Sequence, residues 1–283
     1  MALYPGSSAR GCVELCSRAM TERHAAFVQR YGRWAVVAGA SEGLGAAFAG
    51  ALAARGVSLV LLARRAELLE ELATKLRAEH GVEVRPVACD LADATFAERL
   101  AQLIRDLEVG VAVYNAAYSF VAPLLERPLS DALRVVDVNV RGPLVLLHTL
   151  VPAMIARGRG AVVLMSSLAG FQGSPRLAAY AASKAFNTVL GESLWAELAP
   201  KGVEVVASCA GAIRTPGYAK TLKKEAPGTL DASEVVEQTL AALGRGPVVI
   251  PGATNKLASQ LLRRLLSRRA AIGIMGRSVS DLE

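Results

Sequence analysis

Cysteine, histidine and aromatic residues are scarce in this chain of 283 residues. The four cysteines form no CxxC pair and only three histidines are present, so we expect neither a disulfide framework nor a metal site. No stretch interleaves aromatic and basic residues as nucleic-acid-binding surfaces do. No N-terminal segment has the basic and apolar regions of a secretory signal. These absences predict a cytoplasmic protein with reduced cysteines, no metal and no nucleic-acid partner.

Long apolar runs are also missing. The closest candidate, residues 144–155, is interrupted by His148 and Pro152 and is shorter than the ~18 to 20 residues of a membrane-spanning helix. Hydrophobic residues nevertheless make up 53% of the chain and charged residues 20%, a mixture that suits helices packed on a parallel sheet. The length predicts one large domain with a sizeable core.

Short apolar runs alternate with longer amphipathic segments from Trp34 onward. Each short run predicts a strand and each amphipathic segment predicts a helix. The repeated strand and helix order predicts an α/β fold: a single Rossmann-like domain with a doubly wound, seven-stranded parallel sheet and helices on both faces. The expected strands are 34–39, 57–63, 82–89, 109–115, 160–167, 203–209 and 247–251, and the longer expected helices are 66–79, 94–107, 129–156, 177–198 and 233–243.

Three segments depart from this alternation. Residues 1–30 carry no strand signal and predict a helical or disordered leader before the domain at 31–253. Residues 214–232 contain two Pro-Gly pairs and predict an irregular substrate lid. Residues 254–283 predict an amphipathic, basic helix and tail. That helix could pack on its own domain or lie on an anionic membrane, and the first interpretation is favoured.

Basic residues exceed acidic ones, and the formal net charge is +7. Part of the excess is concentrated near the C-terminal end, at Arg263, Arg264, Arg268 and Arg269. A cofactor phosphate, a membrane surface and a solvated basic face would each account for such an excess. Net charge alone does not choose among them.

A glycine-rich turn follows the first expected strand. Gly39, Gly43 and Gly45 would let bare backbone approach a pyrophosphate at the start of a helix. A tight turn without a ligand could use the same residues, but the strand before it and the alanine-rich helix after it favour a dinucleotide site. Ser41 and Leu44, inside the turn, are expected to contact the same cofactor.

The second expected strand ends in LVLLARR. Ala63 therefore stands where an acidic residue would accept a hydrogen bond from a free ribose 2′-hydroxyl. Arg64 follows, and a guanidinium can bind a 2′-phosphate through paired, charge-assisted hydrogen bonds. We therefore expect NADP(H) rather than NAD(H), with Arg64 favoured over Arg65 and a solvated helix-start arginine as the alternative. Glu42 would oppose the phosphate by its charge.

Asp90 and Leu91 follow the third expected strand. The carboxylate of Asp90 could accept a hydrogen bond from an adenine amino group, with Leu91 beside it. Asp90 could equally cap a helix that starts near Asp93. Either role lies at the carboxyl end of the sheet, where ligands of this fold class bind.

Tyr180 and Lys184 are four residues apart, on one face of an expected helix. An ammonium near a phenol lowers the phenol pKa from about 10, which suits acid and base catalysis. Ser167 lies thirteen positions before Tyr180, at the end of the fifth expected strand, and Asn139 lies twenty-eight positions before Ser167. Each residue could have an ordinary structural role, but four of them at these spacings favour a catalytic site.

Together these motifs resemble the short-chain dehydrogenase/reductase family over roughly residues 34–251. The resemblance implies that Tyr180 is the general acid in reduction and the base in oxidation, and that Ser167 hydrogen-bonds the reacting oxygen. Lys184 would hold the ribose and tune Tyr180, and both residues would contact the cofactor. Asn139 would keep a helix kinked and anchor a proton-relay water.

The resemblance also assigns further cofactor contacts. Asn115 matches the central asparagine of the family's Asn-Asn-Ala-Gly segment, and Ile213 and Thr215 would contact the carboxamide end of the cofactor. Three positions depart from the family pattern: Ala38 replaces a threonine, Ala117 a glycine and Ala210 a proline. These departures bear on cofactor affinity more than on chemistry.

The expected function is hydride transfer between NADP(H) and a carbonyl or alcohol group of an apolar substrate: a ketone, a 3-ketoacyl chain or a steroid-like ring. Tyr118, Phe120 and Phe171 are the expected apolar lining of its pocket. The alternatives are an NADP(H)-binding sensor or scaffold with little turnover, and an NAD-dependent alcohol dehydrogenase. Residues 144–155 and 177–198 are expected to form the interfaces of a homodimer or homotetramer.

Overall fold

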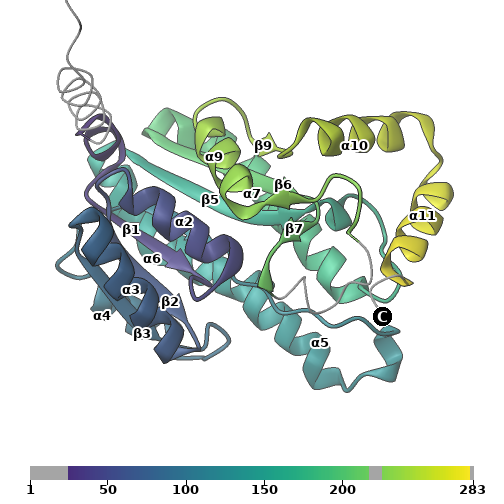
Figure 1. The fold of residues 1–283 in the computed structure, drawn as a ribbon, viewed down its shortest axis with the longest axis horizontal. Helices are drawn as coiled ribbons and strands as arrows, with labels where there is room; N and C mark the ends of the chain where they lie inside the picture. Colours follow the sequence, from purple (N-terminus) through teal and green to yellow (C-terminus); the bar gives the residue numbers. More distant parts are fainter. Residues whose placement is uncertain (1–24, 217–224, 281–283) are drawn as a thin grey trace, which may run out of the picture.

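The computed structural model describes residues 25–216 and 225–280 (Figure 1). Seven parallel strands form one sheet in the order β3-β2-β1-β4-β5-β6-β9, which confirms the predicted fold class. A separate pair of two-residue strands, β7 and β8, lies outside that sheet. The strands are β1 (Trp34–Ala38), β2 (Ser58–Ala63), β3 (Val84–Ala88), β4 (Val109–Tyr114), β5 (Gly160–Ser167), β6 (Val203–Ala210), β7 (Ile213–Arg214), β8 (Leu230–Asp231) and β9 (Val248–Val249).

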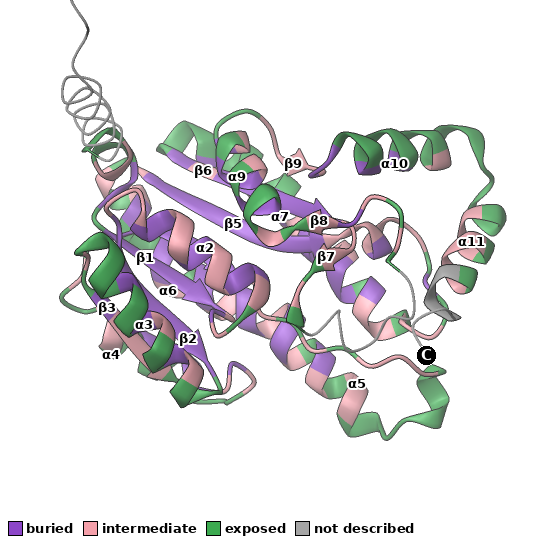
Figure 2. Ribbon diagram, viewed as in Figure 1, coloured by how far each residue is buried: buried purple, intermediate pink, exposed green. Residues whose placement is uncertain are grey.

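Helices cover both faces of the sheet because each buried strand has apolar side chains on both sides. One hydrophobic cluster joins the sheet to α2 (Gly43–Ala53), α3 (Ala66–His80) and α9 (Ala232–Ala242). The opposite cluster joins it to α4 (Phe96–Leu103), α6 (Gly142–Arg157) and α7 (Ala178–Leu198). Figure 2 shows the buried residues concentrated in the sheet and on the helix faces turned toward it. The strand order reverses between β1 and β4, which places a ligand crevice at their carboxyl ends.

The long helix expected at 129–156 is interrupted. It consists of α5 (Leu129–Val136), the π-helical segment η2 (Asp137–Arg141) and α6. Among the described residues, the run Leu129–Arg157 is the one helical stretch whose length and composition would allow it to cross a membrane, and half of its most apolar window is buried in the domain. Short helical turns complete the described chain: η1 (Leu124–Glu126), η3 (Leu168–Phe171) and η4 (Ala199–Lys201).

The C-terminal region differs from the single helix and tail that the sequence predicted. It forms two helices, α10 (Ala253–Leu265) and α11 (Arg268–Ser280). They are separated at Ser267, whose Oγ accepts a hydrogen bond from the backbone N–H of Ala270 at 3.3 Å. Of the expected leader, residues 25–31 are helical and residues 1–24 lie outside the described part. The middle of the expected lid, 217–224, also lies outside it.

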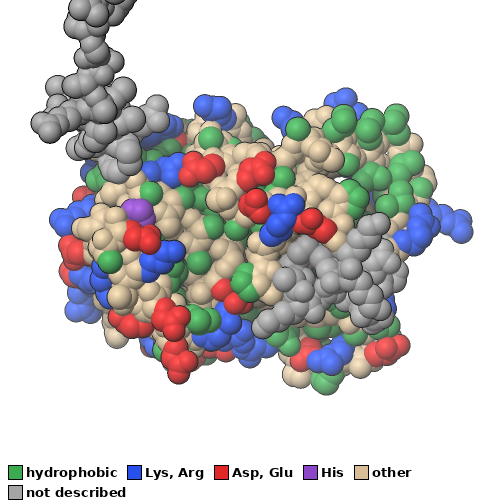
Figure 3. Space-filling view, viewed as in Figure 1, with side chains coloured by type: hydrophobic (Ala, Val, Ile, Leu, Met, Phe, Trp, Pro, Cys, Tyr) green, Lys and Arg blue, Asp and Glu red, His purple; other side chains and the backbone are tan. Residues whose placement is uncertain are grey.

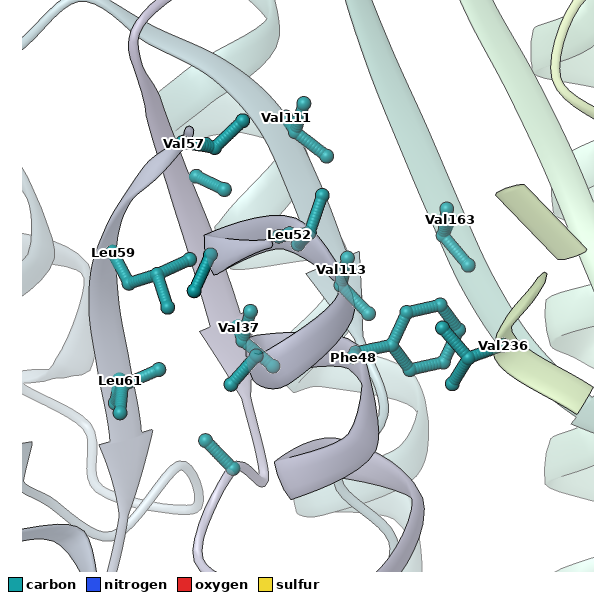
Figure 4. Close-up of a cluster of buried hydrophobic side chains, with 14 of the residues drawn as sticks. Val37, Phe48, Leu52, Val57, Leu59, Leu61, Val111, Val113, Val163 and Val236 are labelled. Carbon is teal, nitrogen blue, oxygen red and sulfur yellow. The ribbon is translucent and has the colours of Figure 1, made fainter. Parts of the chain in front are cut away.

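Phe48 of α2 lies in the hydrophobic cluster between the sheet and α9. Its side chain is fully buried, and Figure 4 shows the ring beside Val113 of β4 and Val236 of α9. The ring therefore packs α2 and α9 against β4. Because α2 begins at the glycine turn, this packing also supports the wall of the crevice.

We predict that Phe48→Ala lowers the free energy of unfolding by about 3–5 kcal/mol, because the lost apolar contact leaves a cavity in a rigid core. Urea denaturation followed by circular dichroism measures the change. Glu71→Ala, at an exposed position of α3, serves as the control and should change stability by less than about 0.5 kcal/mol. Equal stability of the two variants would contradict the packing described.

Candidate functional site

A cavity of about 500 Å³ opens at the carboxyl ends of β1 to β4. Its volume lies within the ~300–1,000 Å³ range of ligand pockets. Nine of the residues that the sequence assigned to the cofactor line it: Gly39, Ser41, Gly43, Leu44, Arg64, Asp90, Leu91, Asn115 and Thr215. Four other residues that the sequence assigned to the cofactor are not among its lining residues: Gly45, Tyr180, Lys184 and Ile213. Ile213 lies in β7 and packs against the hydrophobic core instead.

Two glycines allow the turn after β1 to lie against the chain after β4. Gly39 has a φ of +81°, and a Cβ there would lie 2.6 Å from the Cα of Ala116. A Cβ on Gly45 would lie 1.9 Å from the carbonyl oxygen of Gly39. The side-chain amide of Asn115 donates to that same oxygen at 2.9 Å. Asn115 thus holds the turn in place by its hydrogen bond to the Gly39 carbonyl. Gly45 is needed because a side chain there would overlap the same carbonyl.

The start of α2 suits an anionic group. The helix begins at Gly43, no side chain caps its first N–H groups, and its first turn has no acidic residue. Uncapped N–H groups at a helix start carry a partial positive charge and bind phosphates. The bare glycine backbone and these N–H groups fit the pyrophosphate of a dinucleotide.

Glu42 does not stand as an unpaired negative charge beside the cavity. Its Oε1 lies 2.7 Å from Nη2 of Arg65, and the same Arg65 nitrogen donates to Ser41 Oγ at 3.1 Å. Arg64, which also lines the cavity, forms no hydrogen bond or salt bridge with another described residue. The ion pair therefore offsets the repulsion expected from Glu42 and leaves Arg64 as the cation available to a ligand.

Asp90 is held by Arg134, a residue that the sequence did not single out. Arg134 Nη2 lies 2.6 Å from Asp90 Oδ2, and the backbone N–H of Ala92 donates to Oδ1 at 3.0 Å. Partial burial opposes ionisation, but these hydrogen bonds outweigh it and hold the pKa of Asp90 below its ordinary value. The helix-capping hypothesis for Asp90 is wrong, because α4 begins only at Phe96.

Arg134 comes from α5, outside the sheet. Its guanidinium lies 5.5 Å from the ring centroid of Tyr118, and both residues line the cavity. Tyr118 therefore belongs to the nucleotide cavity, whereas the sequence placed it in a substrate pocket. No local sequence signal marks Arg134, since its contacts come from a segment forty-four residues away.

Tyr180, Ser167 and Lys184 lie together at the end of β5 and on α7. The Ser167 side chain lies near enough to the Tyr180 phenol to lower the pKa of that phenol. Lys184 is 3% exposed, its Nζ lies 5.6 Å from the centroid of the Tyr180 ring, and it donates to the carbonyl oxygen of Met165 at 2.8 Å. The structure thus brings three of the four predicted catalytic residues into one cluster.

The pKa values in this cluster differ from the simple expectation. Burial raises the pKa of Tyr180, and the Ser167 side chain opposes that shift. Burial also lowers the pKa of Lys184 to about 8. The sequence-based expectation that Lys184 lowers the phenol pKa is therefore not met in this structure, where desolvation is the larger effect and Ser167 supplies the opposing one.

Asn139 lies in η2 and connects three segments. Its side-chain amide donates to the Tyr118 carbonyl and to Ser183 Oγ, each at 2.9 Å, and its Oδ1 accepts from the Tyr118 N–H at 2.8 Å. Its own carbonyl accepts from Asn187 at 3.2 Å. The helix irregularity expected at Asn139 is present as a π-helical segment. Ser183 and Asn187 are positioning residues that the sequence did not single out.

Of the three departures from the family motifs, the one at Ala38 leaves a backbone contact in place. The carbonyl of Ala38 accepts from the N–H groups of Asn115 and Ala116 at 3.0 and 2.9 Å, which needs no particular side chain. Ala117 lines the cavity, and Ala210 is buried at the end of β6.

The described cysteines, Cys89 and Cys209, are buried and free.

These features define a dinucleotide-binding α/β domain with a hydroxyl-rich cluster at the end of β5 and on α7. A family model for the short chain dehydrogenases matches residues 33–226. The chain belongs to the short-chain dehydrogenase/reductase family of oxidoreductases, as its sequence motifs predicted.

Relatives with known names are similar over most of the chain. It is 34% identical to a 7beta-hydroxysteroid dehydrogenase of Clostridium sardiniense over 234 residues, which cover 81% of this chain and 89% of that protein. It is 39% identical to a very-long-chain 3-oxoacyl-CoA reductase of Podospora anserina, over 63% of this chain but only 55% of the reductase. The chain therefore matches little more than half of that second protein's length.

Solved structures give the same family. One from a study of 7beta-hydroxysteroid dehydrogenase stereoselectivity aligns with a TM-score of 0.84 and 30% identity, over 88% of this chain and 98% of its own. A short-chain dehydrogenase from Sphingobium yanoikuyae in complex with NADPH aligns with a TM-score of 0.74 and 28% identity, over 88% and 96% of the two chains.

We predict that Lys184 makes the stability of the protein without ligand increase with pH. The folded-state pKa is about 8 and the ordinary value is 10.5, so between these values the unfolded chain binds more protons than the folded one. The stability of the wild type relative to Lys184→Met should therefore rise from pH 8 to pH 10.5, by about 3 kcal/mol at most. Urea unfolding of both proteins across this range measures the difference, and a flat difference would contradict the buried, low-pKa lysine.

Proposed function

We propose that this chain transfers hydride between NADP(H) and the carbonyl or alcohol group of an apolar substrate, with Tyr180 as the general acid and base. The observation that carries the proposal is the grouping of Tyr180, Ser167 and the buried Lys184 at the end of β5 and on α7, in a domain whose glycine turn and Arg64 line a cavity of ligand size. Two hydroxyls near a buried cation, in a domain with a phosphate-binding turn, suit carbonyl reduction.

The chemistry divides between cofactor and protein. The nicotinamide supplies or accepts the hydride when it is bound. Ser167 and Tyr180 donate hydrogen bonds to the carbonyl oxygen, which gains negative charge as the hydride arrives, and Tyr180 delivers the proton. The phenol is protonated at neutral pH, as an acid in reduction must be, since its ordinary pKa is about 10 and burial raises it. Lys184 would hold the nicotinamide ribose.

Asn139 is a positioning residue in this scheme. Its hydrogen bonds to Ser183 and to the chain at Tyr118 fix the helix that carries Tyr180 relative to the cavity. The water relay that the family resemblance implies would start at the π-helical segment that contains Asn139. Ile213 is expected to support β7, the strand that leads to Thr215, and so to position Thr215 near the carboxamide end of the cofactor.

NADP(H) is favoured over NAD(H) because Arg64 is free to bind a 2′-phosphate while Arg65 is paired with Glu42. The NADPH complex of the Sphingobium yanoikuyae relative supports this choice. The intact tetrad favours turnover over a sensor or scaffold role, since binding alone needs no hydroxyl pair at the reacting position.

An apolar substrate is supported by the residues beside Ser167 and by the names of the relatives. Phe171 ends the turn that follows Ser167, and Phe120 lies on the loop after β4. The relatives include proteins named for hydroxysteroids and for 3-oxoacyl thioesters. Both kinds of compound have a large apolar part with an oxidisable or reducible oxygen. We place the protein in the cytoplasm, which the free, buried Cys89 and Cys209 support.

We predict that Tyr180→Phe lowers kcat for NADPH-dependent reduction of apolar ketones by about 10²–10⁴-fold, because the proton donor is lost. NADPH affinity should change little, since the phenyl ring still fills the position. Absorbance of the nicotinamide measures turnover, and its fluorescence measures binding. Equal turnover of the variant and the wild type would exclude Tyr180 as the general acid.

We predict that Arg64→Ala weakens NADPH binding by about 10- to 100-fold and leaves NADH binding unchanged, because a charge-assisted contact with the 2′-phosphate is lost. Fluorescence titration with each nucleotide measures both affinities. Arg245→Ala is the matched control, since Arg245 is an exposed arginine in the turn before β9. A similar loss for NADH and NADPH would assign Arg64 a structural role.

We predict a homodimer or homotetramer in solution. The apolar residues Leu129, Leu133 and Val136 of α5 and Val189 of α7 are exposed in the single chain, and such clusters on folded proteins mark interfaces. Static light scattering measures the mass. Leu129→Glu together with Leu133→Glu should reduce it to that of a single chain, and a wild-type mass of one chain would contradict the interface.

A further inference from the structure

Helix α10 has its polar side toward the protein and its leucines toward the solvent. Asn255 and Ser259 are buried. Leu257, Leu261 and Leu265 are 60%, 48% and 74% exposed. Surface helices ordinarily show the opposite arrangement, with apolar residues against the core. The favoured sequence interpretation, a helix packed on its own domain with solvated arginines, agrees with this attachment but did not indicate that the polar side faces the protein.

Hydrogen bonds hold the polar side of α10 in place. The Asn255 amide donates to the carbonyls of Gly228 and Pro251 at 2.9 and 3.2 Å. Ser259 Oγ donates to the Lys256 carbonyl at 3.0 Å, so it is satisfied within the helix. The leucines contribute little to this attachment. They are spaced at i, i+4 and i+8, so they form one row, the leucine face.

Every charged residue between positions 253 and 280 is basic. Arg264, in the last turn of α10, and Arg269, at the start of α11, are exposed and form no hydrogen bond or salt bridge with another described residue. In Figure 3, hydrophobic side chains gather over the position of α10, and Lys and Arg side chains lie beside them. An apolar row flanked by arginines is the pattern of helices that lie at an anionic lipid surface.

Charge favours a lipid surface over a second copy of this chain. A symmetric contact between two leucine faces would bring two wholly basic segments together, and like charges close to one another destabilise a contact. An anionic leaflet supplies the opposite charge, and each arginine near it strengthens binding. The cytoplasmic leaflets of cell membranes carry such charge, which agrees with the proposed location.

The two C-terminal helices also adjoin the candidate active site. The Arg263 guanidinium lies 4.8 Å from the ring centroid of Phe171, and Arg268 donates to the Phe171 carbonyl at 3.3 Å. Ile272 of α11 lies against Gly173. Phe171 ends the turn that begins directly after Ser167. The inner side of these helices therefore borders the catalytic loop, while the leucine face points away from the domain.

We propose that the leucine face of α10, together with Arg264 and Arg269, docks this protein on an anionic lipid surface. Docking would bring the loop after Ser167 close to the bilayer, where apolar compounds accumulate. The docking itself stands on the described surface alone. The benefit for substrate delivery rests on the proposed function.

Vesicle sedimentation of the full chain tests the docking. The wild type should sediment with vesicles of phosphatidylcholine and phosphatidylserine and remain in solution with phosphatidylcholine alone or in high salt. Leu257→Gln with Leu261→Gln should abolish sedimentation. Arg264→Gln with Arg269→Gln should reduce the affinity for anionic vesicles about tenfold or more.

Matched controls separate this surface from general stickiness. Arg33→Gln with Arg245→Gln removes two basic residues elsewhere, and Leu125→Gln removes a leucine that is 96% exposed near α5. Both should sediment clearly more than the α10 variants. Thermal melting of every variant, followed by circular dichroism, establishes that each one is folded without relying on any enzymatic activity.

Three outcomes would overturn the proposal. In the first, the wild type sediments with neither kind of vesicle. In the second, the wild type and the folded leucine variant sediment equally. In the third, the wild type binds no vesicles and the leucine variant has a smaller mass than the wild type by light scattering. The last outcome would assign the leucine face to a second copy of the chain. Failure of NADPH turnover alone would affect the proposed function and leave the docking in place.

Discussion

The hydrogen bonds of Asn139 hold the two halves of the site in one arrangement. Its side chain satisfies both backbone groups of Tyr118, on the loop after β4, and also reaches Ser183 on α7. The first segment belongs to the nucleotide cavity and the second to the helix that carries Tyr180 and Lys184. Because the amide is fully buried, leaving any of these groups unsatisfied would be costly. The π-helical segment around Asn139 is the local distortion that makes this position possible.

Alternation of short apolar runs with amphipathic segments was sufficient to predict the sheet, since each buried parallel strand leaves a continuous apolar signature. The glycine turn was equally readable, because Gly39 and Gly45 are required by backbone contacts that allow no side chain. The interruption at η2 could not be located from periodicity, because a segment of five residues is too short to show an apolar period of its own. Arg134 was missed for a different reason: its pairing with Asp90 depends on where α5 packs.

Electrostatics explain where the sequence was most misleading. Glu42 in the turn argued against a phosphate, but its pairing with Arg65 neutralises it and leaves Arg64 for the ligand. Spacing alone suggested that Lys184 lowers the pKa of Tyr180, yet burial acts on both groups and raises the phenol's value. At α10 the leucine and arginine pattern was correctly identified as amphipathic, but periodicity does not tell which side meets the protein. The buried Asn255 and Ser259 decide that.

The central claim is that one chain joins a 2′-phosphate-binding dinucleotide cavity to the Tyr180, Ser167 and Lys184 cluster. Diffraction from crystals soaked with NADPH tests this most directly. The account predicts the pyrophosphate at the start of α2, the 2′-phosphate on Arg64, and the nicotinamide beside the Tyr180 hydroxyl. Nucleotide density elsewhere, or a nicotinamide directed away from Tyr180, would contradict it.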